Sequence, residues 1–522
     1  MLDLKLTNAR IRTMDGRRPT ATVLGVWRGR IVGLDEEVAH LPARREVDLR
    51  GATVLPGFVD AHVHLAWAGL KARTPSVAAG RTAADVLALI RTAAAAAPRD
   101  GWLDVAGYDQ RRIGRELTAA ELDAAGGGRR TIVTHDSGHA CVVSGSVLAM
   151  LPEGTRHRDG VLAESGMAAV RALRMPYTRD ELARAVEHAA GVCVSEGVTA
   201  CAEAGIGGGL IAHSPAEAAA YQLLRAGGRL PLRVQLMVAS SALHPLAGHP
   251  SDGPQWGLDL GLRGGFGDDR LSLGALKVFT DGGMMPRTAA LTEPYEGLDH
   301  GGELYADEEE LTDTIVRGHL AGWQLAVHAI GDRAVDVTLR ALREAQRALP
   351  RPDARHRVEH AGLVRPDQLP LFAELGLTAV VQPSFLWYLG DDYAPLMGER
   401  RAPWLYRGQG FLDHGVALAG SSDRPVTDGA PLRAVQVMVQ RASATGLPIG
   451  PKEAMGVHDA LYAYTMGGAY ACRREEELGS LSAGKCADWV VLDEDPCEVP
   501  VERIGDVAVL STHVAGEQVY AA

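Results

Sequence analysis

The sequence lacks several features that would assign a protein to a specialised class. Its six cysteines are scattered through 522 residues without a Cys-x-x-Cys pair, which argues against a disulfide framework and a cysteine zinc motif. No uncharged apolar run reaches the roughly 18 residues of a membrane span. The first residues, MLDLKLTNARIRTMDG, show no apolar core behind a basic segment, so no secretory signal is expected. Together these absences predict a cytoplasmic protein with reduced thiols.

The charge distribution narrows the classes of partner. The formal net charge is −12 at pH 7 and no block of Lys or Arg stands out, so neither nucleic acid nor a membrane surface is predicted as a partner. A Gly-x-Ser-x-Gly motif for a serine nucleophile is also missing. What remains is an ordinary globular composition, 46% hydrophobic and 23% charged, in a chain long enough for more than one domain.

Short apolar segments recur along the chain, and most of them are followed by an amphipathic helical pattern. This alternation predicts a parallel sheet, and eight repeats predict an α/β fold of the (β/α)₈ TIM-like barrel type. The eight predicted strands are residues 54–64, 197–205, 232–240, 273–283, 323–332, 355–362, 378–385 and 416–423.

The segments outside this rhythm predict two additional parts. Residues 1–55 and 476–522 contain short strands and turns, and we expect them to form one small β-sandwich domain from both chain termini. Residues 56–475 would form the barrel. Within it, residues of about 66–180 are too long for a plain loop and contain both a helical pattern and a strand-like one, so they predict an inserted α/β subdomain that covers the active-site end.

Polar residues gather at the predicted carboxyl ends of the barrel strands, where barrel active sites form. His62 and His64 lie two apart on the first strand, so their side chains point to the same side. Taken singly, a buried histidine is more often a core residue, Lys277 could pair with Asp281, and Asp423 could cap a turn. Their joint occurrence predicts a metal centre, since imidazole and carboxylate suit zinc and related divalent ions. The six candidate ligands are His62, His64, Lys277, His328, His360 and Asp423.

Several stretches resemble the amidohydrolase superfamily, and more narrowly the amidohydrolase-3 branch that includes N-substituted formamide deformylases. They are PGFVDAHVHL, LKVFTDGG, AVHAIGDRAVD, RVEHAG, SSDRPV, RTAALTEPYEG and GSLSAGKCADWVVLDEDP. The resemblance covers nearly the whole chain. It implies the barrel with a terminal β-sandwich, one or two divalent metal ions, most often zinc, and a homodimer.

The resemblance also implies a role for each ligand. His62 and His64 would bind the more buried ion, and His328 and His360 the other. Asp423 would be both a ligand and the catalytic proton shuttle.

Lys277 would bridge both ions as an N6-carboxylated lysine; the alternative is an unmodified lysine beside a single ion. Glu203 stands where the branch tends to have Asp, and we therefore leave it out of the ligand set.

The predicted activity is hydrolysis of a carbon–nitrogen bond other than a peptide bond, in a small N-formyl or N-acyl amine substrate, by metal-activated hydroxide. The alternatives are a cyclic-amide or carbamate hydrolase, a deaminase of the same superfamily, and a non-catalytic binding or regulatory protein on the same barrel. A deaminase would carry a glutamate after the fifth strand, where this chain has HAIGD.

Residues outside the ligand set are candidates for contacts with the substrate. His139 lies in the predicted insertion, and the resemblance implies a catalytic role for it in holding the carbonyl oxygen. The candidate substrate-binding residues are Trp67, Tyr108, His135, Arg287 and Trp387; aromatic residues of this kind more often fill the core, and the role of Arg287 is left open.

Overall fold

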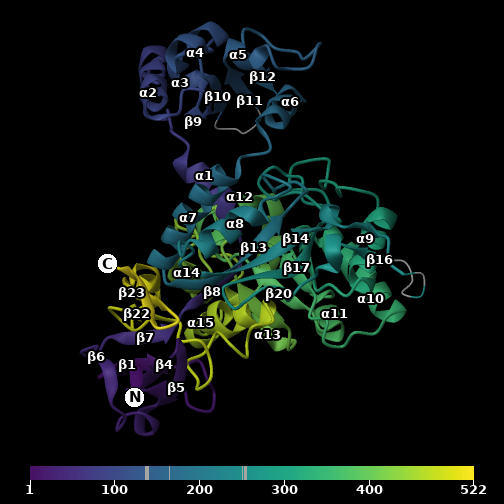
Figure 1. Ribbon diagram of the computed structural model, residues 1–522. Helices are drawn as coiled ribbons and strands as arrows, with labels where there is room; N and C mark the ends of the chain where they lie inside the picture. Colours follow the sequence, from purple (N-terminus) through teal and green to yellow (C-terminus); the bar gives the residue numbers. More distant parts are fainter. Residues whose placement is uncertain (136–139, 164, 250, 252–254) are drawn as a thin grey trace. The chain divides into compact units, whose positions relative to one another are not determined.

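The computed structural model describes residues 1–135, 140–163, 165–249, 251 and 255–522. The chain separates into two compact units, one formed by residues 1–68 together with 186–522 and the other by residues 69–185. Figure 1 colours both along the sequence. Each unit is described by itself.

Eight parallel strands in the larger unit form one sheet that is nearly closed, in the order β21-β20-β19-β18-β17-β14-β13-β8. This confirms the predicted TIM-like barrel. The strands are almost entirely buried, as expected for a sheet covered on both faces. Their bounds are β8 (Phe58–Val63), β13 (Val198–Ile206), β14 (Arg233–Ala239), β17 (Leu271–Phe279), β18 (Leu325–Ala329), β19 (Arg357–His360), β20 (Thr378–Val381) and β21 (Ala417–Gly420).

The first predicted strand is in fact two strands, and the prediction of one continuous strand was wrong. β7 (Thr53–Pro56) pairs antiparallel with β22 (Trp489–Leu492), whereas β8 pairs parallel with β13. Between them, a Cβ atom on Gly57 would lie 2.1 Å from Oγ1 of Thr199. Only glycine therefore fits at this junction, and the chain changes sheets there.

Helices connect most of the barrel strands. One connection departs from the pattern: the described residues between β14 and β17 form the hairpin β15 (His244–Leu246) and β16 (Gln255–Gly257) with short 3₁₀ turns. In the part of the chain described, no helix is both long and apolar enough to cross a membrane. The helices that follow barrel strands are α1 (Leu65–Arg73), α8 (Ala218–Ala226), α9 (Glu308–Leu320), α10 (Asp332–Ala348), α11 (Leu369–Glu374), α12 (Ser384–Arg401), α13 (Gln409–Asp413), α14 (Pro431–Gln440), α15 (Val457–Tyr462) and α16 (Gly468–Ala471), while α7 (Arg179–Ser195) leads into β13.

Strands from both ends of the sequence form two further sheets in the larger unit. One has the order β5-β4-β1-β6, and the other has the order β24-β23-β22-β7-β2-β3. Apolar residues of both sheets, including Leu24, Ile31, Val54 and Trp489, pack in one buried cluster. The remaining bounds are β1 (Leu2–Thr7), β2 (Arg10–Arg12), β3 (Thr20–Ala21), β4 (Leu24–Trp27), β5 (Arg30–Leu34), β6 (Ala43–Asp48), β23 (Val509–Val514) and β24 (Glu517–Ala521).

The smaller unit has a four-stranded sheet of its own, in the order β12-β11-β10-β9. Apolar residues of its first helix and of the sheet, such as Ile90, Val105 and Val133, form its core. The strands are β9 (Trp102–Tyr108), β10 (Arg130–His135), β11 (Ala140–Val143) and β12 (Val161–Ala163), and the helices are α2 (Ala83–Ala96), α3 (Gln110–Ile113), α4 (Ala119–Gly126), α5 (Gly145–Leu148) and α6 (Ser165–Arg174).

Candidate metal centre

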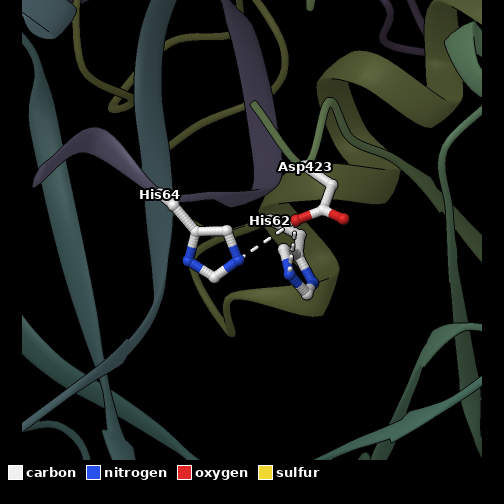
Figure 2. Close-up of side chains that lie close together, drawn as sticks. All are labelled: His62, His64 and Asp423. Atoms are coloured by element: carbon white, nitrogen blue, oxygen red, sulfur yellow. Dashed lines mark ion pairs between the residues drawn. The ribbon is translucent and has the colours of Figure 1, made fainter. Parts of the chain in front are cut away.

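Three of the predicted ligands converge at the carboxyl end of the barrel strands (Figure 2). One side-chain ligand atom from each of His62, His64 and Asp423 lies within 4.8 Å of the others. Nε2 of His62 lies 3.4 Å from Oδ1 of Asp423, and Nε2 of His64 lies 3.1 Å from the same oxygen. His62 belongs to β8, His64 follows it directly, and all three residues are buried.

The backbone places Asp423 opposite the histidines. Asp423 follows β21 and has a φ of 50°, a left-handed conformation that Asp tolerates better than most residues. Its neighbour Ser422 donates through its backbone amide and its hydroxyl to the buried carboxylate of Asp60, at 3.0 and 2.5 Å. Since Asp60 belongs to β8, these bonds hold the segment after the last barrel strand against the first strand.

Two further predicted ligands continue the cluster. The ring centroid of His360 lies 4.9 Å from that of His62 and 4.3 Å from that of His328. Nδ1 of His360 is 3.9 Å from Oδ2 of Asp423. His360 ends β19 with a φ of 70°, an uncommon conformation that is a recurrent property of functional sites. The four imidazoles thus lie side by side in one buried volume.

Three of the four histidines have a hydrogen-bond acceptor at one ring nitrogen. Nδ1 of His360 donates to Oε1 of Gln382 at 2.8 Å, and Nε2 of His328 donates to the carbonyl oxygen of Gly282 at 3.1 Å. Such an acceptor fixes which ring nitrogen keeps its lone pair. The acceptors are Glu359 for His62, Gln382 for His360 and the carbonyl of Gly282 for His328. Nδ1 of His64 lies 3.7 Å from Oε1 of Glu203.

Charged groups set the protonation of the cluster. Burial lowers the pKa of His360 to about 3 and that of His328 well below its ordinary value, so both rings are neutral and can donate a lone pair. Burial also acts to raise the pKa of Asp423, but its contacts with His62 and His64 outweigh burial and hold that pKa well below its usual range. For His64, burial lowers the pKa, but Asp423 and Glu203 raise it more, to about 9.

Lys277 lies on β17 with its ammonium end inside the barrel. The residue is 1% exposed, and Nζ has no hydrogen-bond partner among the described residues. Burial lowers the pKa of Lys277 to about 8, although the charges of Glu359 and Asp423 act in the opposite direction. Nζ lies 4.8 Å from the ring centroid of Phe279, which in turn contacts the ring of His328.

The donor set fits a divalent cation. Nε2 of His62 is buried and makes no hydrogen bond within the described part of the chain, and it faces a carboxylate that is ionised. A buried polar atom without a hydrogen-bond partner costs free energy, and a cation between the imidazoles and Asp423 would relieve that cost. Imidazole nitrogens with one carboxylate are a ligand set that zinc and related ions accept.

The other candidate residues of the larger unit differ in their relation to this cluster. The ring of Trp67 lies 5.8 Å from that of His64, and Trp67 is 36% exposed, so it flanks the cluster. Arg287 is exposed. Trp387, on α12, packs beneath the guanidinium of Arg433 at 4.7 Å. Among the described residues, neither Arg287 nor Trp387 makes a hydrogen bond, ion pair or ring contact with the four histidines.

The candidate residues of the smaller unit form a local cluster of their own. The hydroxyl of Tyr108 donates to Glu116 at 2.7 Å, and the ring of Tyr108 lies 6.1 Å from that of His135. Nε2 of His135 lies 3.7 Å from Oδ1 of Asp109. A cavity of about 210 Å³ is lined by both Tyr108 and His135. His139 lies outside the described residues.

Sequence reasoning missed the residues that support the ligands. Arg357 and Glu359 alternate on β19, immediately before His360, and both are fully buried. Two opposite charges on one face of an apolar strand were the available signal. Glu203, excluded from the ligand set, is 2% exposed and accepts the backbone amide of Leu65 at 2.8 Å and the hydroxyl of Tyr221.

The fold and the cluster define a barrel enzyme with metal-binding residues at the carboxyl ends of its strands. The chain belongs to the amidohydrolase family, whose sequence model matches residues 45–520. The resemblance predicted from the sequence is therefore confirmed, and the chain is a metal-dependent hydrolase of this family.

Individual relatives align over nearly the whole length. The N-substituted formamide deformylase of Arthrobacter pascens is 30% identical, with 99% of this chain and 98% of that protein covered. The putative amidohydrolase YtcJ of Bacillus subtilis is 27% identical, with 92% and 91% covered. Among solved structures, an uncharacterised metal-dependent hydrolase from Pyrococcus horikoshii has a TM-score of 0.80 and 25% identity, with 96% of this chain and 99% of that chain covered.

Proposed function

We propose that this hydrolase cleaves a carbon–nitrogen bond other than a peptide bond, in a small N-formyl or N-acyl amine. The observation that carries the proposal is the buried convergence of His62, His64 and Asp423 at the carboxyl end of the barrel. The similarity to a protein named N-substituted formamide deformylase supports the choice of substrate class.

We infer that six residues hold the metal. His62, His64 and Asp423 would ligate one ion, most simply zinc, because they form the closest cluster. His328 and His360 would serve a second ion, since their rings lie 4.3 Å apart and burial keeps both neutral. Lys277 would join the two sites.

In the proposed reaction the metal ion would activate the water and the carbonyl group, and a side chain of the protein would transfer the proton. When bound, a divalent ion lowers the pKa of water and polarises a carbonyl group. Asp423 supplies the proton transfer: one of its carboxylate oxygens accepts the proton that water loses, and it then protonates the leaving nitrogen. This step matters for amides because an amine leaves only when protonated.

Lys277 becomes a ligand by carboxylation. The neutral amine would attack carbon dioxide, forming a nitrogen–carbon bond and losing one proton, and the resulting carbamate carries a negative charge with two oxygens. The burial that lowers the pKa of Lys277 to about 8 favours the neutral amine that this reaction needs. An anion at this position would also balance the charge of two cations.

One experiment tests the proposal. Purified protein is freed of metal, reloaded with Zn²⁺, and assayed on matched panels of N-formyl amines, N-acyl amines, cyclic amides, carbamates and aminopurines, with metal content measured in parallel. We expect hydrolysis of the first two panels, dependent on metal. Hydrolysis confined to cyclic amides, carbamates or aminopurines would contradict the proposed substrate class, and equal turnover without metal would contradict the mechanism.

A further inference from the structure

A buried carboxylate and a buried guanidinium lie directly behind His62. Nδ1 of His62 is 2.6 Å from Oε2 of Glu359. Glu359 in turn accepts two hydrogen bonds from Arg357, at 2.7 and 3.0 Å. All three side chains are fully buried. Arg357 also donates to the carbonyl oxygen of Ala61 at 2.6 Å, so the pair is tied to the same strand that carries His62.

The arrangement specifies a single form of the His62 ring. Glu359 is ionised because the adjacent guanidinium of Arg357 stabilises its negative charge, and an ionised carboxylate can only accept hydrogen bonds. Nδ1 of His62 must therefore carry a hydrogen and donate it. In the neutral ring the lone pair then lies on Nε2, and this atom is 3.4 Å from Asp423 without a hydrogen bond among the described residues.

The ion pair of Arg357 and Glu359 differs from a purely structural ion pair because Glu359 also contacts a metal-ligand candidate. A buried ion pair rarely adds net stability compared with apolar residues of similar volume. Here both carboxylate oxygens of Glu359 accept hydrogen bonds from Arg357, and one of the two, Oε2, also accepts from His62. The residue next along the chain is His360, so one short strand supplies both a ligand and the support of another ligand.

We propose that Glu359, held by Arg357, is a positioning residue for His62. It keeps the hydrogen on Nδ1 and aims the Nε2 lone pair at the metal position. The inference rests on the proposed function to the extent that the centre binds a divalent ion. Removing such a support lowers metal affinity by roughly 10- to 100-fold.

The test removes the pair as a whole, so that no lone charge is left in the core. The dissociation constant of the metal-free protein for Zn²⁺ is measured by competition with a chromophoric chelator, in the wild type and in the variant Arg357→Leu/Glu359→Leu. We expect the dissociation constant to rise by about 10- to 100-fold. A matched control, Arg407→Leu/Glu453→Leu, removes another buried pair whose arginine binds the carbonyl oxygen of Val364, and it should leave the affinity unchanged.

A second measurement detects which ring nitrogen of His62 carries the hydrogen. The ring nitrogens of ¹⁵N-histidine-labelled metal-free protein are observed by NMR, and the signals of His62 are assigned by comparison with His62→Gln. We expect the Nδ1–H form in the wild type and its loss in the double variant. A purely structural role would lower the melting temperature without moving these signals.

Several outcomes would overturn the inference. One is an unchanged dissociation constant in the folded double variant, and another is an Nε2–H form of His62 in the wild type. If the double variant does not fold, Glu359→Asp answers the question, because it keeps the charge for Arg357 but withdraws it from His62; unchanged affinity there also overturns the inference. A wild-type protein that binds no metal would instead defeat the proposed function.

Discussion

The backbone amide of Asp423 donates a hydrogen bond to the carbonyl oxygen of His62 at 2.8 Å. This bond joins the segment after the last barrel strand to the first strand, at the two residues whose side chains face each other in the metal centre. The same hydrogen bond therefore holds the two strands together and fixes the distance between the two ligands. This main-chain bond needs no side-chain atom, so variants other than proline at position 423 can keep the closure.

The first prediction uses this property. Asp423→Asn keeps the main-chain bond and a residue type that tolerates positive φ, but the amide cannot accept and return a proton. We expect kcat to fall by about 10²- to 10⁴-fold while the fold and most of the metal are retained. Steady-state kinetics combined with elemental analysis check this, and near-normal kcat in a metal-replete variant would refute the shuttle role.

The second prediction concerns the two histidines of β8. His62→Ala and His64→Ala should each lose most of the bound metal, because no neighbouring side chain can replace a ligand fixed by a strand. Elemental analysis of the purified variants measures the loss. His458→Ala is the control, since His458 is exposed and lies beside Asp459 and Tyr462, away from the four clustered histidines. Full metal content in either strand variant would show that the pair is structural.

The third prediction concerns Lys277. Lys277→Ala should abolish activity and reduce the metal content from about two ions per chain, because the bridging anion is lost. Short carboxylic acids added to the variant should restore part of the turnover by replacing the carbamate. In wild-type protein supplied with ¹³C-bicarbonate, a carbamate carbon signal is expected by NMR. Its absence in metal-saturated protein would leave the one-ion alternative.

The fourth prediction concerns acid stability and a histidine outside the centre. His513 on β23 stacks on Trp489, with ring centroids 4.5 Å apart, and burial lowers its pKa to about 4. Between pH 6.5 and 4 the unfolded chain therefore binds a proton that the folded protein excludes. Stability is complete above pH 6.5 and falls as the pH drops toward 4, by ~3 kcal/mol from this group.

His513→Phe should keep the stacking and remove this titration. Denaturant unfolding of the metal-free wild type and of His513→Phe at pH 7.5 and pH 5 measures the difference. The wild type is expected to lose more stability than the variant between the two pH values. An equal loss in both proteins would mean that His513 does not contribute.

The barrel strands could be predicted because their signals are local. An apolar run followed by an amphipathic helix marks β13, β17 or β20 without knowledge of the rest of the fold. The break between β7 and β8 could not be predicted in the same way, because the apolar run continues across it. What separates the two strands is the space around Gly57, which Thr199 fills from a distant part of the chain.

In the candidate site, too, the residues that local sequence patterns mark could be predicted, and the contacts that depend on the folded barrel could not. His62, His64 and Asp423 could be proposed because parallel strands bring their carboxyl ends together. Glu359 could not be assigned to His62, since 297 positions separate them and their hydrogen bond is a product of the closed barrel. Trp387 stays a prediction: it follows β20 closely in sequence, and on α12 its ring packs against the guanidinium of Arg433.

The pairing of β7 with β22 has a consequence for the protein during its synthesis. His62 and His64 are synthesised before residues 489–492. The strand β7, which leads into the strand of the two histidines, can therefore pair with β22 only after residues 489–492 have emerged from the ribosome. Asp423 emerges after both histidines as well. The nascent chain therefore carries the two histidines before their partners exist, and we expect the ion to enter only after Asp423 has been made.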